Sequence, residues 1–199
     1  MNSQILSRLS VIKSKWVFVL LWLSTFMLYV ATRKAGWVID GLGLLYNIRH
    51  KSFWDFINST QSGDQGFYQL LTLPYYVFYS QFGMNEWFWG LLFITLQSLN
   101  ALLVFVFFRN LLRDSSIRNG TLITLAAVAI FTVAPHISEV VVWRACFHYL
   151  LSFCFIMSAL LMVQKYQHTG EARYIWITLL VFILASVTHP IFYLVPAFV

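Results

Sequence analysis

The stretch VAPHISEVVVWRACFHYLLSF, residues 133–153, places polar side chains inside a strongly apolar part of the chain. His136 and Glu139 are three positions apart, so a helix would bring them to one face as two metal ligands. No third ligand stands at a fixed spacing nearby, which makes a divalent metal the weaker interpretation. An isolated charge in hydrocarbon costs at least about 2.5–3.5 kcal/mol. Glu139 and Arg144 must therefore reach the headgroups, pair with each other in a simple polar turn, or line a wet cavity.

The composition indicates that the chain lies in the hydrocarbon of a membrane. Hydrophobic residues make up 60% of the 199 residues and charged residues only 10%, where globular proteins have about 45–50% and about 25%. Aromatic residues reach 19%, and their amphipathic rings favour the water–lipid boundary. Cys146 and Cys154 lie in one apolar run, and a helix would hold them about 12 Å apart, too far for a disulfide.

The apolar runs predict an all-α fold, a polytopic transmembrane helix bundle that forms a single transmembrane domain over residues 1–199. Basic residues flank the first run on both sides and no small-residue cleavage site follows it, so we expect a retained helix rather than a signal peptide. The expected helices are about 16–32, 87–108, 121–135, 145–163 and 174–187, with the start of another at 191–199. A span does not end after so few residues, and we therefore expect the sequence to be the front part of a longer protein.

The basic residues predict which end of the bundle faces the cytoplasm, because Lys and Arg accumulate in cytoplasmic loops. With the N-terminus in the cytoplasm, the inner segments hold eight basic and two acidic residues, and the outer segments hold five of each. The net charge of +6 is then a consequence of topology, and no nucleic-acid partner is needed to explain it. We therefore expect an integral, multi-pass protein of a bacterial inner membrane or an ER-type membrane.

The outer segment at 33–86 is far longer than the two inner connections, and long connections with an apolar pattern of their own are commonly functional. Apolar residues at helical spacing in 44–50 and 53–59 predict two amphipathic surface helices in this large first extracytoplasmic loop. The run 66–83 is rich in Tyr, and we expect Pro74 to interrupt it. Such a run favours an interfacial or re-entrant segment over a full crossing.

Pro135 predicts where one spanning helix ends. Its ring carries no amide proton for a continuing helix, so we expect the run 121–135 to break or kink there. Residues 136–144 would then lie at the outer membrane face, on the same side as the long loop.

Three stretches, in this order, resemble the GT-C superfamily of polytopic glycosyltransferases, which includes protein O-mannosyltransferases and their TMTC-like and bacterial relatives. They are GWVIDGLGLLYN with Asp40, GFYQLLTLPYYVFYSQFGMNEWFWG before the second helix, and APHISEVVVWRACFHYLL around the Pro135 turn. Family members share a large outward loop with an early acidic residue, an aromatic-rich "RPL…fG.n" stretch and a "P-h-x-[ST]-E-x-v-x-w" turn. The resemblance covers nearly all of the chain, and the ordered combination is more specific than any single motif.

The resemblance implies a reaction at the extracytoplasmic face, in which a sugar moves from a polyprenyl-phosphate donor to an acceptor. It also implies that Asp40 is the general base for the acceptor hydroxyl, a role that suits a desolvated carboxylate. The phosphate leaving group needs positive or hydrogen-bonding partners, and the candidates are Arg144, His136 and His189. Glu139 is a further expected substrate-binding residue. The expected partners are membrane lipid, the polyprenyl-phosphate sugar and other membrane protein subunits, and no cofactor is expected beyond the donor.

The chain departs from the family pattern at two places. Family members frequently carry paired acidic residues in the first loop, whereas Asp40 is followed by glycine. The usual Arg-Pro pair is replaced by Gln69-Leu70. Asp40 could also be the N-cap of a following helix, since Asp is a preferred capping residue. Asp55 and Asp64 are expected to be solvated loop residues.

Several polar residues inside the expected spans have packing as their simplest explanation. Gln97, Ser98 and Asn100 are expected to hold helices together through polar contacts. We expect His148 to be hydrogen-bonded between helices. His189 either faces the substrate phosphate or ends its helix as an ordinary polar residue.

Two other functional classes remain open. A non-catalytic membrane scaffold subunit with a GT-C-like frame is favoured by the single Asp40 and the short chain. A transporter would also need polar groups in the membrane, but the long aromatic loop and the lack of paired broken helices disfavour it. The transfer activity of an Asp40→Asn variant would discriminate an enzyme from a scaffold.

Overall fold

The computed structural model describes residues 14–34, 46, 49–50, 52–55, 69–113, 117, 119–143 and 146–188. The elements are α2 (Ser14–Tyr29), the 3-10 helix η1 (Val30–Lys34), α5 (Gln69–Phe82), α6 (Glu86–Arg113), α7 (Gly120–Val133), α8 (Pro135–Val142), α9 (Phe147–Thr169) and α10 (Arg173–Thr188). No strand occurs within these ranges, so the all-α prediction is confirmed for the described part of the chain. The helix expected to start at 191 lies outside it.

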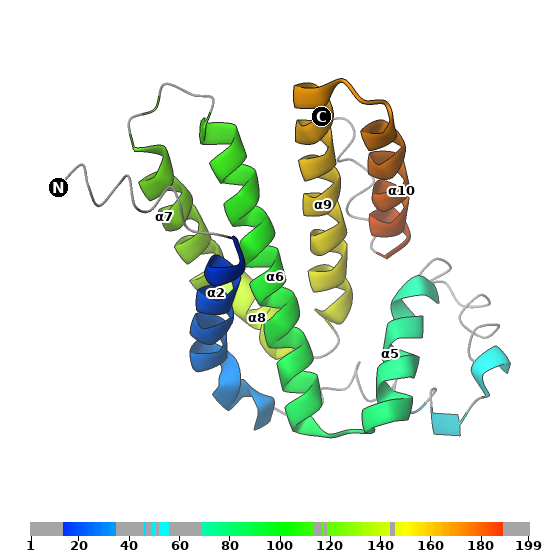
Figure 1. The fold of residues 1–199 in the computed structure, drawn as a ribbon. Helices are drawn as coiled ribbons and strands as arrows, with labels where there is room; N and C mark the ends of the chain where they lie inside the picture. Colours follow the sequence, from blue (N-terminus) through cyan, green and yellow to red (C-terminus); the bar gives the residue numbers. More distant parts are fainter. Residues whose placement is uncertain are drawn as a thin grey trace.

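The helices α6 and α9 lie side by side at the centre of the arrangement and run in the same direction (Figure 1). Near their first turns the rings of Phe93 and Phe147 pack with centroids 5.8 Å apart. Near their last turns the Gln164 amide donates to the carbonyl of Phe107 at 3.3 Å. Because each contact joins corresponding ends, the two helices are parallel.

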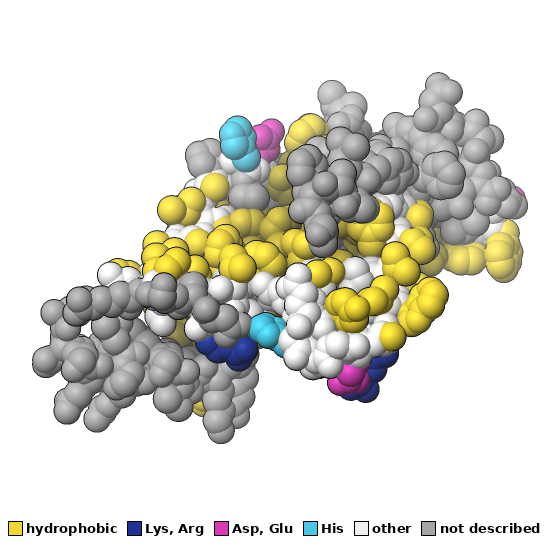
Figure 2. All heavy atoms as spheres, turned by 90° about the horizontal axis from the view of Figure 1, so that it is seen from above, with side chains coloured by type: hydrophobic (Ala, Val, Ile, Leu, Met, Phe, Trp, Pro, Cys, Tyr) yellow, Lys and Arg dark blue, Asp and Glu magenta, His cyan; other side chains and the backbone are white. Residues whose placement is uncertain are grey.

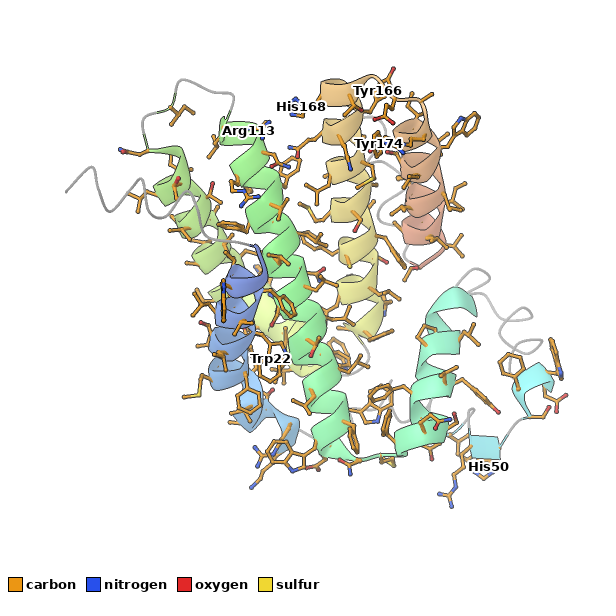
Figure 3. The ribbon with its side chains drawn as sticks, in the orientation of Figure 1. Trp22, His50, Arg113, Tyr166, His168 and Tyr174 are labelled. Carbon is orange, nitrogen blue, oxygen red and sulfur yellow. The ribbon has the colours of Figure 1, made fainter. Side chains whose placement is uncertain are left out.

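The helix α2 runs antiparallel to α6. Near its start, Val17 belongs to the same buried cluster as Phe105, in the second half of α6. Further along, the Trp22 indole donates to the hydroxyl of Thr95 at 3.0 Å, and these two helices lie against each other in Figure 3. The segment at 33–86, called the long segment below, therefore starts at the end of the molecule where α6 begins.

Three helical stretches are long and apolar enough to cross a membrane by length and composition. They are Trp16–Lys34, Glu86–Arg113 and Phe147–Thr169, of 19, 28 and 23 residues. Two further apolar helices, Gly120–Val133 and Arg173–Thr188, are shorter. With a rise of 1.5 Å per residue, the 14 residues of α7 extend about 21 Å, less than the hydrocarbon thickness of about 30 Å. Figure 2 looks at the end where α6 finishes, and hydrophobic side chains occupy much of the described surface in that view.

The two central helices are longer than hydropathy predicted. The expected ranges 87–108 and 145–163 stop before polar residues, whereas α6 continues to Arg113 and α9 to Thr169. The extra turns carry amide side chains that meet across the interface, where Asn110 donates to Gln164 at 3.4 Å. A helix can therefore continue through polar residues, because its backbone hydrogen bonds do not depend on the side chains.

A tight turn joins α5 to α6. Gly83 has a positive φ of 56° and its amide donates to the carbonyl of Tyr79 at 2.7 Å, which is a common way to end a helix. The Asn85 side chain then accepts from the amide of Trp87 at 3.0 Å and caps the start of α6. The expected interruption at Pro74 is wrong, because α5 is continuous through this residue. Pro74 is the sixth residue of α5, so its missing amide proton leaves the carbonyl four residues earlier without the usual helical donor, and the helix tolerates this loss.

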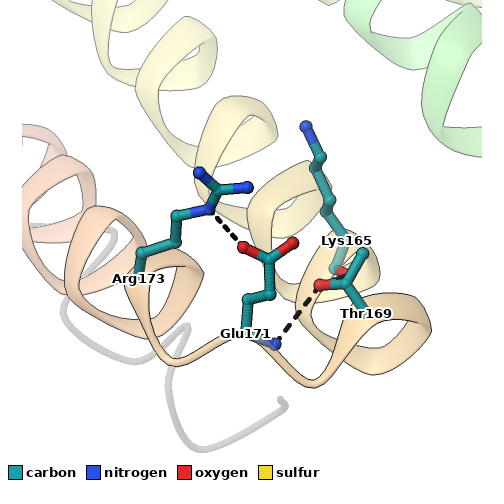
Figure 4. A network of polar contacts seen from close by, with 4 residues as sticks. All are labelled: Lys165, Thr169, Glu171 and Arg173. Carbon is teal, nitrogen blue, oxygen red and sulfur yellow. Dashed lines mark hydrogen bonds and ion pairs between the residues drawn. The ribbon is translucent and has the colours of Figure 1, made fainter.

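Contacts among residues of the turn between α9 and α10 stabilise that turn (Figure 4). Gly170 has a φ of 68° and its amide donates to Tyr166 at 2.8 Å. Arg173 pairs with Glu171 at 2.6 Å, and both side chains are well exposed, so this ion pair adds about 0–1 kcal/mol. The ring of Tyr174 lies under two cations, with Lys165 Nζ 4.7 Å from its centroid and the Arg173 guanidinium 4.9 Å from it.

The buried cluster around Trp89 and Phe93 predicts a clear difference between two leucines. Leu150 is 3% exposed within this cluster, so Leu150→Ala should lower the free energy of unfolding by about 2–5 kcal/mol. Leu180 is 60% exposed on α10, and Leu180→Ala should change it by less than about 0.5 kcal/mol. Denaturant unfolding of the protein in detergent micelles, followed by circular dichroism, measures both. Equal losses would contradict the assigned core.

Candidate functional site

A single extended residue separates α7 from α8. Ala134 has φ −57° and ψ 134°, and Pro135 follows as the first residue of α8. The residue before a proline avoids the helical region because its backbone would clash with the pyrrolidine ring. Proline itself suits the first helical position, where its missing amide proton is not needed. The predicted break is confirmed, and it ends α7 at Val133, two residues before the expected end of the run 121–135.

The short helix α8 has an outward face and an inward face. His136 and Glu139 are both exposed, and their spacing brings them to one side, as predicted. Ser138 and Val141 lie on the nearly opposite side, since each helical residue turns by about 100°. Val141 is 1% exposed and belongs to the buried cluster that includes Trp89. The helix therefore presents an imidazole and a carboxylate to the surroundings while its other face packs on the bundle.

Tyr29, the last residue of α2, makes contacts on both sides of the break. Its hydroxyl lies 2.8 Å from the carbonyl oxygen of Thr132 in α7 and 2.8 Å from the hydroxyl of Ser138 in α8. Both distances are typical of hydrogen bonds between oxygen atoms. The phenol has a single proton, and a carbonyl can only accept, so Tyr29 donates to Thr132. The Ser138 hydroxyl is then the donor to Tyr29, and its one proton is shared with a longer contact to the Ala134 carbonyl at 3.2 Å.

The carbonyl of Thr132 needs such an external donor. It belongs to the last turn of α7, where carbonyl oxygens have no partner within the helix. A buried acceptor left without a hydrogen bond costs about 1–3 kcal/mol. The Tyr29 ring is itself only 6% exposed, so its hydroxyl satisfies this carbonyl away from water.

The long segment leaves the bundle at this same corner through η1. The Thr32 hydroxyl donates to the carbonyl of Tyr29 at 2.7 Å, and the Arg33 guanidinium donates to that of Val30 at 2.9 Å. Arg33 also lies over the indole of Trp87, 4.0 Å from the ring centroid, in a cation–π contact. These contacts hold the start of the segment against the first turn of α6.

Three of the five expected site residues lie outside the described residues, namely Asp40, Arg144 and His189. Their roles stay predictions, as does the expected solvation of Asp64, which also lies outside. Asp55 is described and exposed, and its carboxylate accepts from the Ser52 hydroxyl at 2.6 Å.

Ser52 also stabilises the helical turn that follows it. Its hydroxyl accepts from the amide of Asp55 at 3.2 Å, as a helix N-cap does. The ring of Phe53 packs edge-on against Tyr76 of α5, with centroids 5.4 Å apart. The part of the loop that the structure describes thus contains a helical turn held against α5, near the predicted start of a surface helix.

The polar residues of α6 behave differently from one another. Asn100 holds two helices together as predicted, because its amide donates to the carbonyl of Leu150 in α9 at 2.9 Å. Ser98 instead donates to the carbonyl of Ile94 in its own helix at 2.7 Å. Gln97 is fully buried, and neither polar atom of its side chain has a partner among the described residues. His148 packs against Tyr149, with ring centroids 4.3 Å apart, and its expected hydrogen bond between helices stays a prediction.

Sequence reasoning missed the residues that organise this corner. Tyr29 and Arg33 carry no local motif, and their partners are distant in sequence. Ser138 stands at the Ser/Thr position of the "P-h-x-[ST]-E" turn, and that position was the one available signal. Within the described ranges, no group of three or more His, Cys, Asp and Glu side chains could hold a metal ion.

No protein-family model, curated protein or solved structure matches this chain.

The contrast between Gln97 and Asn100 predicts effects of opposite sign. Gln97→Leu should leave the free energy of unfolding unchanged or raise it by about 1–3 kcal/mol, because it removes buried polar atoms that lack partners. Asn100→Leu should lower it by about 0.6–1.7 kcal/mol, the range for polar contacts between helices in a membrane. Unfolding in mixed micelles measures both variants. A loss for Gln97→Leu as large as for Asn100→Leu would show that Gln97 makes a stabilising contact.

Proposed function

We propose that the chain is a multi-pass membrane protein that moves a sugar from a polyprenyl-phosphate donor to an acceptor hydroxyl at the extracytoplasmic face. The observation that carries the proposal is the bridge made by the Tyr29 hydroxyl. The Tyr29 hydroxyl connects the end of α2, where the long segment starts, to α8, the helix that exposes His136 and Glu139. The proposal needs these two parts on one side of the membrane, because the general base and the groups that bind the donor must meet.

The proposed reaction forms one bond and breaks another at the same carbon. Asp40 takes the proton of the acceptor hydroxyl while the oxygen of that hydroxyl attacks the anomeric carbon of the sugar. The bond between that carbon and the phosphate oxygen breaks, and the lipid phosphate leaves with an additional negative charge. Arg144 and His136 donate hydrogen bonds to this phosphate, with His189 as a further donor. Glu139 accepts hydrogen bonds from hydroxyl groups of the substrate.

The distribution of charge supports a membrane orientation with the N-terminus in the cytoplasm. At the end where α6 and α9 finish, the described residues include five basic residues, Lys15, Arg109, Arg113, Lys165 and Arg173, and one acidic residue, Glu171. At the other end, the described basic residues Arg33, Lys34 and Arg49 are matched by three acidic residues, Asp55, Glu86 and Glu139. Figure 3 places Arg113 and His168 at the first end and His50 at the second. The first end therefore has the positive excess of a cytoplasmic face.

A non-catalytic scaffold subunit is the second candidate, and one observation favours it. His136 and Glu139 point away from the described helices instead of toward a neighbouring element. An exposed imidazole and carboxylate on one helical face could bind a polar surface of another membrane protein. Activity measurements separate this candidate from the enzyme.

The proposed base role predicts a strong dependence on Asp40. Asp40→Asn should lower the rate of sugar transfer by about 10²–10⁴-fold, because a positioned general base contributes that much. Asp55→Asn is the matched control and should retain the wild-type rate, since among the described residues the hydrogen-bond partner of Asp55 is Ser52 in its own turn. Transfer from a radiolabelled lipid-phosphate sugar in membrane vesicles measures both. Activity that survives Asp40→Asn would remove the base role, and an inactive wild type would favour the scaffold.

The proposed orientation predicts which side of the membrane each end occupies. In a background with Cys146→Ala and Cys154→Ala, a cysteine at Glu139 should react with a membrane-impermeant maleimide in intact cells or spheroplasts. A cysteine at Glu171 should react only after the membrane is permeabilised. Both positions are exposed in the wild type, so access is decided by the membrane. The reverse pattern would place the N-terminus outside.

A further inference from the structure

We propose that Tyr29 is a positioning residue that fixes α8, through its hydroxyl, relative to the start of the long segment. This role rests on the proposed function, which assigns a substrate to the outward face of α8. The Tyr29 hydroxyl does not bond to His136 or Glu139, because its hydrogen-bond partners are the Thr132 carbonyl and the Ser138 side chain. Tyr29 therefore acts on the substrate-binding residues through the helix that carries them.

The short helix α8 cannot hold its own orientation. It has eight residues, and isolated helices shorter than about 12–15 residues are marginal in water. Its link to α7 is a single extended residue, Ala134, so the direction of α7 is not transmitted through continuous helical hydrogen bonds. Contacts from the rest of the bundle must therefore set how α8 lies.

Among the described side chains of α8, Val140 and Val141 make apolar contacts with the bundle and Ser138 makes a directional one. Val141 packs in the buried cluster with Trp89 and Phe147, and apolar packing tolerates small rotations. Ser138 bonds to the Tyr29 hydroxyl at 2.8 Å, and a hydrogen bond weakens steeply when its geometry changes. The rotational setting of α8 thus depends on this bond, and with it the direction in which the opposite face points.

Tyr29 is well suited to this role because contacts outside α8 also hold it in place. Its ring is buried in the same cluster as Val141, and its carbonyl is bonded to the Thr32 hydroxyl at 2.7 Å. The start of the long segment and the setting of α8 are therefore fixed by one residue. Any shift of the phenol would move both parts of the proposed site together, and loss of the hydroxyl would uncouple them.

Hydrogen–deuterium exchange of the purified full chain in lipid nanodiscs tests the positioning role without any substrate. In Tyr29→Phe, which keeps the ring and loses the hydroxyl, we expect the amides of α8 to exchange about tenfold faster while those of α9 keep their protection. Ser138→Ala should give the same local increase. Tyr79→Phe is the matched control, because Tyr79 is half-buried beside the same cluster and its hydroxyl has no hydrogen bond to a described residue. Unchanged exchange of α8 in Tyr29→Phe would overturn the inference.

Transfer kinetics test whether the position of α8 is used in catalysis. Tyr29→Phe should lower kcat/KM for the lipid-phosphate sugar about tenfold and raise the KM, because a displaced α8 loses contacts with the bound donor as well as with the leaving phosphate. Partial unfolding would instead lower kcat at an unchanged KM. In a His136→Ala background, Tyr29→Phe should add little further loss, since residues that act together are not additive. Additive losses would overturn the positioning role.

The two measurements distinguish failure of this inference from failure of the proposed function. A wild-type chain without transfer activity, with faster α8 exchange in Tyr29→Phe, would reject sugar transfer and retain Tyr29 as the residue that sets α8. Active wild-type protein with unchanged α8 exchange would reject the positioning role and retain the proposed function.

Discussion

A proline that follows an apolar helix leaves carbonyl oxygens without amide donors, and the end of the molecule where α6 begins depends on how one of them is satisfied. The Thr132 carbonyl receives its proton from the phenol of Tyr29, more than a hundred residues earlier in the chain. Because that phenol also accepts from Ser138, the same group holds both sides of the break. A local deficit in backbone hydrogen bonding thus becomes a tertiary contact that joins three helices.

The rest of the arrangement relies on few polar contacts in a largely apolar setting. In lipid, moving an apolar side chain from the acyl chains into a helix interface gains little free energy, because both environments are apolar. Packing and hydrogen bonds between helices therefore decide which helix faces meet. Along α6 such bonds occur at successive levels: Thr95 with Trp22, Asn100 with the Leu150 carbonyl, and Asn110 with Gln164. Each bond joins α6 to one neighbour at one height, and together they set the register of α2 and α9 against it.

Gln97 does not fit this pattern. It is one turn from Asn100, fully buried, and its amide bonds to no described residue. A buried polar group of this kind lowers stability unless it is compensated. Two carboxamide side chains on the same helix, one glutamine and one asparagine, can therefore have opposite effects on stability. The difference comes from whether a carbonyl on the neighbouring helix lies within reach.

The sequence predicted the helical class and the approximate places of the three helices that are long and apolar enough to span a membrane, because those features follow from composition and hydropathy. It erred where a helix could tolerate an unfavourable residue. Pro74 was expected to interrupt α5, yet the helix is continuous through it, and the ring of Phe78 one turn later packs on Trp89 with centroids 4.7 Å apart. The predicted ends of α6 and α9 also came too early. Hydropathy falls at polar residues, whereas the two helices continue through them.

For the candidate site, the sequence by itself determined that His136 and Glu139 share a face and that the chain breaks before them, because helical spacing and proline geometry are local properties. Only the tertiary structure decided which way that face points and what holds it. The contact between Tyr29 and Ser138 joins residues 109 positions apart, and neither one carries a local signal that specifies the other. Such a pair forms only when α2, α7 and α8 pack together, so the position of α8 is a property of the packed bundle.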